Sequence, residues 1–292
     1  MKAAVIGASG LVGSHLMKTC KDRGWDVMGT YSEHAQKGLI PLHMADPASI
    51  EEAMQKMKPE VVFLTAFNPN ADYCEEHPKE TWETNVQGNA NVIEASQRIG
   101  AKTVYYSSDY IFNGKSGPYE EDATPDPICE YGKQKLAVEQ MIRRLTKNHL
   151  IIRTTVVYGW EEQGKNFFCN LLAHLERGEE MKVPSDQIGT PTLVNDLAEA
   201  SCSLVEVGAS GIVNVAGPDR MSRYEFALHI ARIFDLPVSK IIPVTTMELK
   251  QPARRPLNAG LLYDRLFQLA NLQMKGVETG IRYLKETEKQ TP

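Results

Sequence analysis

The chain has 292 residues, of which 42% are hydrophobic and 24% charged, so it can bury a sizeable core and carry a second, smaller lobe. A formal net charge of −5 argues against nucleic acid as a main partner, because phosphate binding needs a basic surface. Since the sequence contains neither an apolar run of about 18 residues nor a signal-peptide pattern, we expect a cytoplasmic protein without a membrane partner.

Strand-like and helix-like runs alternate over the first 159 residues. Apolar or β-branched runs predict strands at Lys2–Ile6, Asp26–Gly29, Glu60–Thr65, Lys102–Ser108 and His149–Gly159. Helical periodicity predicts helices at Leu11–Lys21, from Pro47 onward, at Trp82–Ile99 and at Tyr131–Leu145. Continuous apolar strands separated by helices indicate a parallel sheet covered on both faces.

The pattern loosens after residue 159. A helix is expected at Leu193–Val207, a strand at Ile212–Gly217 and a helix at Tyr224–Phe234, while the C-terminal stretch KETEKQTP is polar and expected to be frayed. We therefore predict an α/β fold: a Rossmann-type doubly wound parallel sheet with a smaller, discontinuous C-terminal substrate lobe. The NAD(P)-binding domain is expected at residues 1–159 plus 189–217, and the substrate-binding lobe at 160–188 plus 218–292.

Three glycines spaced three apart, Gly7, Gly10 and Gly13, stand at the first strand–helix junction. Such glycines allow a tight turn and a close approach of backbone to a pyrophosphate, which the helix N-terminus then attracts. The alternative is that they only let the helix pack against the sheet. Their place at the first junction of an alternating chain favours the binding interpretation.

The end of the second strand, GTYSEHAQKG, has no carboxylate at the point where NAD-preferring folds bind the adenosine ribose, although Glu33 follows closely. No arginine marks a 2′-phosphate site, but His34 and Lys37 offer positive charge. NADP is therefore the expected cofactor, with NAD as the alternative. Asp46 is expected to cap a helix, to lie at the adenine, or both.

Tyr131 is the tyrosine in this chain that has a lysine, Lys135, four residues later. On a helix these side chains share a face, and a lysine cation lowers the pKa of a nearby phenol, which makes the tyrosine usable as an acid or base. Ser108 ends a central strand, where a parallel sheet opens to ligand, and could bond the reacting oxygen.

GASGLVG, SSDYIFNG and YGKQK resemble the extended short-chain dehydrogenase/reductase superfamily, and DQIGTPT with PARRPLNAGL narrows the resemblance to the dTDP-4-dehydrorhamnose reductase family. The resemblance runs from Met1 to about Leu262. It implies NAD(P)H-dependent reduction of a nucleotide-linked 4-keto-6-deoxy sugar. Tyr131 is then the proton donor, Lys135 holds the nicotinamide ribose and Ser108 polarises the carbonyl.

Besides the catalytic Ser108, Tyr131 and Lys135, we expect residues that bind the substrate and residues that bind the cofactor. No metal site is expected, since no histidine or cysteine has metal-ligand spacing. The substrate is expected to contact Ser108, Tyr110, Val156, Arg254 and Arg255, where the arginine pair either clamps a diphosphate or forms a solvated salt bridge. The cofactor is expected to contact Gly7, Ser9, Gly10, Leu11, Val12, Tyr31, Ser32, Asp46, Thr65, Ala66, Phe67, Tyr131 and Lys135.

Two departures from the family pattern concern the substrate. Val156 in RTTVVYG stands where the family's reductases usually have tryptophan, and LTAFNPNADYC replaces an alanine-rich loop. The alternatives are a sugar-nucleotide epimerase or dehydratase, or a non-catalytic nucleotide-binding subunit, since SSDY also resembles the regulatory subunit of methionine adenosyltransferase. A homodimer is left open.

Overall fold

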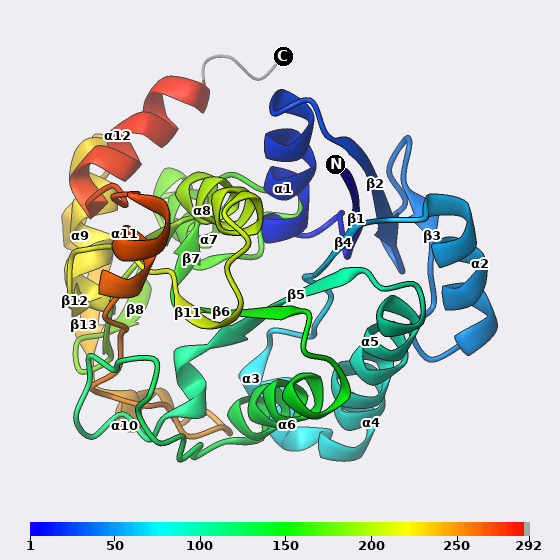
Figure 1. The fold of residues 1–292 in the computed structure, drawn as a ribbon. Helices are drawn as coiled ribbons and strands as arrows, with labels where there is room; N and C mark the ends of the chain where they lie inside the picture. Colours follow the sequence, from blue (N-terminus) through cyan, green and yellow to red (C-terminus); the bar gives the residue numbers. More distant parts are fainter. Residues whose placement is uncertain (289–292) are drawn as a thin grey trace.

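The computed structural model describes residues 1–288, and its centre is a sheet of seven parallel strands in the order β11-β6-β5-β4-β1-β2-β3 (Figure 1). The strand order reverses between β1 and β4, as in a doubly wound sheet. The strands are β1 (Lys2–Ile6), β2 (Asp26–Tyr31), β3 (Ile40–Pro41), β4 (Val61–Leu64), β5 (Lys102–Ser108), β6 (His149–Thr154) and β11 (Gly211–Asn214).

Helices cover both faces of this sheet because successive strand residues point to opposite sides. Ala3 and Val5 of β1 belong to one core cluster, and Ala4 and Ile6 to the other. The helices that supply the first cluster are α1 (Leu11–Asp22), α8 (Val194–Glu206) and α11 (Asp264–Ala270). The helices that supply the second are α2 (Pro47–Met57), α5 (Gly88–Arg98) and α6 (Glu130–Leu145).

The expected helix at Trp82–Ile99 is not one regular helix. After β4 the chain forms α3 (Ala71–Glu76) and α4 (Pro78–Trp82), then a π-helical turn (Glu83–Gln87) that leads into α5. In the π-turn, Asn85 accepts a hydrogen bond from the backbone N–H of Asn68 at 2.7 Å and donates to Gln134 of α6 at 2.8 Å. The wider turn thus fixes the loop after β4 against α6, which sequence periodicity does not reveal.

A smaller lobe packs around a separate apolar cluster that contains Tyr158, Phe168 and Phe226. It includes three short strand pairs, β10–β7, β12–β9 and β13–β8. Its strands are β7 (Val157–Tyr158), β8 (Met181–Pro184), β9 (Ile188–Gly189), β10 (Thr192–Leu193), β12 (Met221–Ser222) and β13 (Ile241–Val244). Its helices are α7 (Phe167–Glu176), α9 (Arg223–Ile233), α10 (Thr246–Leu249) and α12 (Val277–Glu288). Short 3₁₀ turns lie after β5, at Asp109–Ile111, and after α9, at Val238–Lys240.

The predicted fold class, a doubly wound parallel sheet with a smaller lobe, is confirmed, while the proposed domain limits stay a prediction. Lys285–Glu288 of the tail expected to be frayed continue α12, and residues 289–292 lie outside the described part of the chain. Among residues 1–288, no helix is long and apolar enough to cross a membrane.

Candidate active site

The loops after β1 and β4 meet where the strand order reverses, which is the place where open parallel sheets bind ligands. The Thr65 hydroxyl donates to the carbonyl oxygens of Ile6 at 2.9 Å and Gly7 at 3.1 Å. Ala66 donates its backbone N–H to Ile6 as well, at 3.0 Å. The expected cofactor residues Thr65, Ala66 and Phe67 therefore lie directly beside the glycine turn.

The three glycines of this turn have different roles. Gly7 has a φ of +90°, and a Cβ on it would lie 2.8 Å from the backbone nitrogen of Ala66. A Cβ on Gly13 would lie 2.2 Å from the carbonyl oxygen of Gly7, so both positions are needed for packing. A Cβ on Gly10 would meet one atom within 4 Å, the oxygen of Gly7 at 3.6 Å.

Gly10 is also the N-cap of α1, and no side chain caps this helix. The first turn, which contains Leu11 and Val12, thus presents backbone N–H groups and the positive end of the helix dipole beside open space. These features fit the phosphates of a dinucleotide.

The end of β2 supports the same turn through Thr30, which sequence reasoning missed. Its hydroxyl accepts from the N–H of Gly7 at 3.3 Å, and its carbonyl accepts from Ala8 at 2.8 Å. The next expected residues, Tyr31 and Ser32, are half-buried and exposed, respectively. Asp46 is exposed and caps α2 by accepting from Ala48 at 3.0 Å, so its capping role is confirmed.

A segment from the lobe crosses this region. Gln163 donates to the carbonyl oxygen of Ser9 at 3.2 Å, and Lys165 Nζ lies 3.4 Å from His34 Nε2 after β2. These contacts span more than a hundred residues of sequence, and no motif signals them.

Ser108 ends β5, and Tyr131 stands in the first turn of α6. The phenol ring of Tyr131 lies edge-on to Phe67 and to Tyr110, with ring centroids 5.5 Å apart in both pairs. The Ser108 hydroxyl accepts from the N–H of Tyr110 at 3.2 Å and donates to Asp109 Oδ1 at 3.2 Å. The structure thus brings Ser108, Tyr110, Tyr131 and Phe67 together.

Lys135 lies one turn further along α6 and is buried. Its ammonium donates to the carbonyl oxygen of Tyr106 at 2.8 Å and lies 3.7 Å from the centre of the Phe67 ring. Burial lowers the pKa of Lys135 to about 7. The nearby Glu139, which forms a buried ion pair with Arg153 at 2.8 Å, acts in the opposite direction and raises it.

The expected lowering of the Tyr131 pKa by Lys135 is wrong for this structure. Burial raises the pKa of the phenol well above its usual value, although the nearby Ser108 hydroxyl opposes the shift. Lys135 does not lower the pKa of Tyr131 because its ammonium is directed to the carbonyl oxygen of Tyr106 and lies 5.8 Å from the centre of the Tyr131 ring. Tyr131 is therefore a neutral phenol at neutral pH, which suits a proton donor.

Asp109, next to Ser108, is turned into the protein. It accepts from the Thr155 hydroxyl at 2.7 Å, and burial raises the pKa of its carboxyl.

Val156, which follows Thr155 in the chain, has a φ of +41°, which is strained for a β-branched side chain. Val156 is half-buried and packs against the core of the lobe.

The two arginines expected to contact the substrate, Arg254 and Arg255, have different surroundings. Arg254 is exposed, whereas the Arg255 side chain is 8% exposed and forms an ion pair with Asp72 at 2.7 Å. Asp72 also accepts from the N–H of Ala253 at 3.0 Å. Of the two expected alternatives for Arg255, the salt bridge is present, although it is largely buried rather than solvated.

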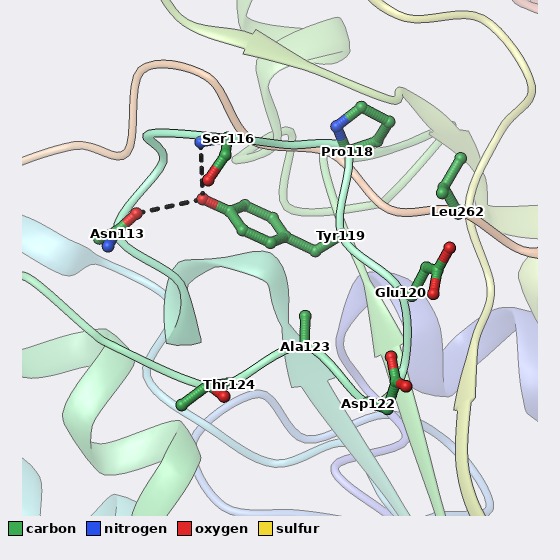
Figure 2. Close-up of a pocket in the computed structure, with 9 residues that line it drawn as sticks. All are labelled: Asn113, Ser116, Pro118, Tyr119, Glu120, Asp122, Ala123, Thr124 and Leu262. Carbon is green, nitrogen blue, oxygen red and sulfur yellow. Dashed lines mark hydrogen bonds between the residues drawn. The ribbon is translucent and has the colours of Figure 1, made fainter.

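A separate pocket of about 400 Å³ lies in the loop between β5 and α6 (Figure 2). The Tyr119 hydroxyl there donates to Asn113 Oδ1 at 3.1 Å and accepts from the N–H of Ser116 at 3.2 Å. The lining contains none of the expected site residues: it consists of Asn113, Ser116, Pro118, Tyr119, Glu120, Asp122, Ala123, Thr124 and Leu262. Across residues 1–288, no cluster of three or more acidic, histidine or cysteine side chains could hold a metal ion.

Known proteins resemble this chain over nearly its whole length. The family model "RmlD substrate binding domain" matches residues 1–287. The spore coat polysaccharide biosynthesis protein SpsK of Bacillus subtilis is 35% identical over 287 residues, which cover 98% of this chain and 97% of that protein. Methionine adenosyltransferase 2 subunit beta of Xenopus tropicalis is 30% identical over 288 residues, covering 96% and 86%.

Among solved structures, dTDP-4-dehydrorhamnose reductase from Bacillus anthracis in complex with NADP matches with a TM-score of 0.89 and 30% identity, over 98% of this chain and 99% of that one. The chain therefore belongs to the RmlD substrate binding domain family, within the NAD(P)-dependent oxidoreductases of the extended short-chain dehydrogenase/reductase superfamily.

Proposed function

We propose that this protein is an NAD(P)H-dependent reductase of a nucleotide-linked 4-keto-6-deoxy sugar, similar to dTDP-4-dehydrorhamnose reductase. One observation carries the proposal: Tyr131, a neutral and half-buried phenol, lies with Ser108 at the carboxyl end of β5, and Lys135 lies one turn away. The glycine turn lies at the same edge of the sheet, so a cofactor and a sugar can meet there.

The chain's own residues supply acid catalysis and orientation. A bound nicotinamide cofactor supplies the hydride that reaches the keto carbon. Tyr131 gives its phenolic proton to the keto oxygen, which balances the reduction to an alcohol. Ser108 hydrogen-bonds the same oxygen, and Lys135 holds the nicotinamide ribose and stabilises the phenolate that remains on Tyr131.

NADPH is the proposed cofactor, with NADH as the alternative. The open space at Gly10 and the uncapped first turn of α1 support dinucleotide binding. Tyr31 and Ser32 at the end of β2 bring no carboxylate that would repel a 2′-phosphate, and the solved relative from Bacillus anthracis is a complex with NADP.

Val156, with its strained backbone, supports a pocket that differs from that of a typical rhamnose-precursor reductase. The epimerase or dehydratase alternative has less support, because the Asp109 carboxylate is directed to Thr155 and Ser108 rather than to an open site.

The test is NADPH oxidation by the purified chain with a panel of nucleotide-linked 4-keto-6-deoxy sugars. Tyr131→Phe should lower turnover by about 10²- to 10⁴-fold, because it removes the general acid and keeps the ring contacts. Its fold and NADPH affinity should be unchanged, and Tyr283→Phe on α12 is the matched control. Equal turnover by Tyr131→Phe and the wild type would show that another group donates the proton.

A second candidate is a non-catalytic nucleotide-binding subunit. The 30% identity to methionine adenosyltransferase 2 subunit beta supports it. This candidate expects NADPH binding without reduction of any keto sugar, so the wild-type measurement separates the two functions.

A further inference from the structure

The segment at residues 161–166 lies between β7 and α7 in the smaller lobe, and both of its ends are anchored there. Before it, Trp160 donates its indole N–H to the carbonyl oxygen of Leu284 at 2.9 Å. At its end, Asn166 is the N-cap of α7 and donates its side-chain N–H to the carbonyl oxygen of Gly159 at 3.0 Å. The lobe therefore determines the path of the segment.

The same segment reaches the two places where a dinucleotide is expected. Gln163 donates to the carbonyl oxygen of Ser9, within the glycine turn, at 3.2 Å. Lys165 Nζ lies 3.4 Å from Nε2 of His34, in the loop after β2. Open parallel sheets of this kind bind the pyrophosphate at the first turn and the adenosine ribose at the end of the second strand. The lobe segment therefore forms one wall of the expected cofactor site.

Lys165 has no carboxylate partner, even though two glutamates precede it in the segment. Glu161 accepts a hydrogen bond of 2.9 Å from the N-cap side chain of α7, and Glu162 accepts from the side-chain amide of Gln36. Neither Lys165 nor His34 forms an ion pair among residues 1–288, and both are exposed. The acidic side chains of the segment are thus engaged elsewhere, and two groups that can carry positive charge meet at the end of β2.

The chemistry of this pair suits a phosphate. A lysine ammonium offers three N–H donors and no acceptor, so contact with one imidazole nitrogen leaves donors of Lys165 available. Phosphate oxygens accept strongly from charged donors, and lysine binds them as a compact point charge. The 2′-phosphate on the adenosine ribose is the group that distinguishes NADP from NAD. The exposure of Lys165 and His34 leaves both side chains accessible to it.

We infer that Lys165, together with His34, binds the 2′-phosphate of NADPH, so that a residue of the smaller lobe determines the choice of cofactor. This inference rests on the proposed function, which uses NADPH. It differs from the expectation that the loop after β2 alone, through His34 and Lys37, supplies the positive charge, because Lys165 stands 131 residues beyond His34 in the chain. The 2′-phosphate then joins the lobe to the sheet.

The test measures the binding of NADPH and of NADH to the full chain by the fluorescence of the reduced nicotinamide. Lys165→Ala should weaken NADPH binding about tenfold, or about 1.4 kcal/mol, because it removes one charge-assisted hydrogen bond at an exposed site. NADH affinity should stay unchanged, and Lys165→Arg should retain most of the NADPH affinity. Lys182→Ala on β8, which removes an exposed lysine of the same lobe, is the matched control and should change neither affinity.

Two further measurements isolate the 2′-phosphate. In calorimetry, Lys165→Ala should weaken the binding of adenosine 2′,5′-bisphosphate about tenfold, whereas the affinity for 5′-AMP should not depend on Lys165. The preference of the wild type for NADPH over NADH should also fall as the salt concentration rises, because charges at an exposed site are screened.

Equal losses of NADPH and NADH affinity in Lys165→Ala would mean that the lysine supports the segment rather than the phosphate, which overturns the inference. A wild type that prefers NADH overturns it as well, and so does an NADPH preference that Lys37→Ala removes and Lys165→Ala leaves intact. A Lys165-dependent NADPH preference without reduction of any keto sugar supports the inference and overturns the reductase function instead.

Discussion

Lys135 makes the folded chain less stable than a neutral residue would, and Lys135→Met should reveal this. Burial lowers its pKa from 10.5 to about 7. Between pH 7 and 10.5 the lysine is neutral in the folded chain and protonated in the unfolded chain, so unfolding takes up a proton. The lysine contribution to stability therefore becomes less favourable as the pH falls through this window, and it levels off below pH 7.

The size of the effect follows from the shift. Each pKa unit corresponds to about 1.4 kcal/mol, so the unfavourable contribution of Lys135 is about 4 to 5 kcal/mol at pH 6.5 and about 1 kcal/mol at pH 9.5. Methionine fills a similar volume without a charge. Lys135→Met should thus be more stable than the wild type at pH 6.5, and the difference should shrink by about 3 kcal/mol at pH 9.5.

Urea unfolding of both proteins at several pH values measures this difference. Comparing the two proteins cancels the contributions of the titrating groups that both of them contain. Lys133→Met, an exposed lysine on the same helix, controls for the loss of charge. A stability difference between Lys135→Met and the wild type that stays constant from pH 6.5 to 9.5 would refute the lowered pKa.

Four further substitutions test the packing and the charge balance at and near the site. Gly10→Val should fold normally but lose NADPH affinity in a binding titration. Gly13→Ala should lower the free energy of unfolding by about 1 to 3 kcal/mol, because the new Cβ would collide with the carbonyl oxygen of Gly7. Val156→Gly should be nearly neutral in urea unfolding, since relief of the strained φ offsets lost contacts; Val157→Gly in β7 is the control and should destabilise clearly. Glu139→Gln leaves a buried guanidinium on β6 without its counter-charge and should lower stability by about 3 to 5 kcal/mol, measured in the same way.

The main sheet could be predicted from sequence because its strands are buried on both faces and read as continuous apolar runs. Lys2–Ile6 and Lys102–Ser108 match β1 and β5 residue for residue. The run His149–Gly159 was harder, since the chain leaves the sheet after Thr154 and turns at Val156 with a positive φ. Valine gives no local signal for that conformation, so tertiary contacts must impose it.

Sequence predicted those parts of the site that are local. The spacing of Tyr131 and Lys135 requires only a helix, and a helix is present. Spacing carries no information on burial, however, and burial rather than proximity sets the pKa of both groups. Long-range pairs such as Arg255 with Asp72 depend on how the lobe meets the sheet, which one sequence does not encode in any visible pattern.

The charges of the site indicate how it is adapted to anionic ligands. Tyr131 is neutral and Lys135 is close to half-protonated at pH 7, so the reacting centre carries little charge. An anion that binds nearby favours the protonated lysine and raises its pKa, and by reciprocity the protonated lysine favours the anion. The same burial that lowers the stability of the chain therefore makes the protonation of Lys135 responsive to an anionic ligand, which would increase the positive charge that stabilises a Tyr131 phenolate.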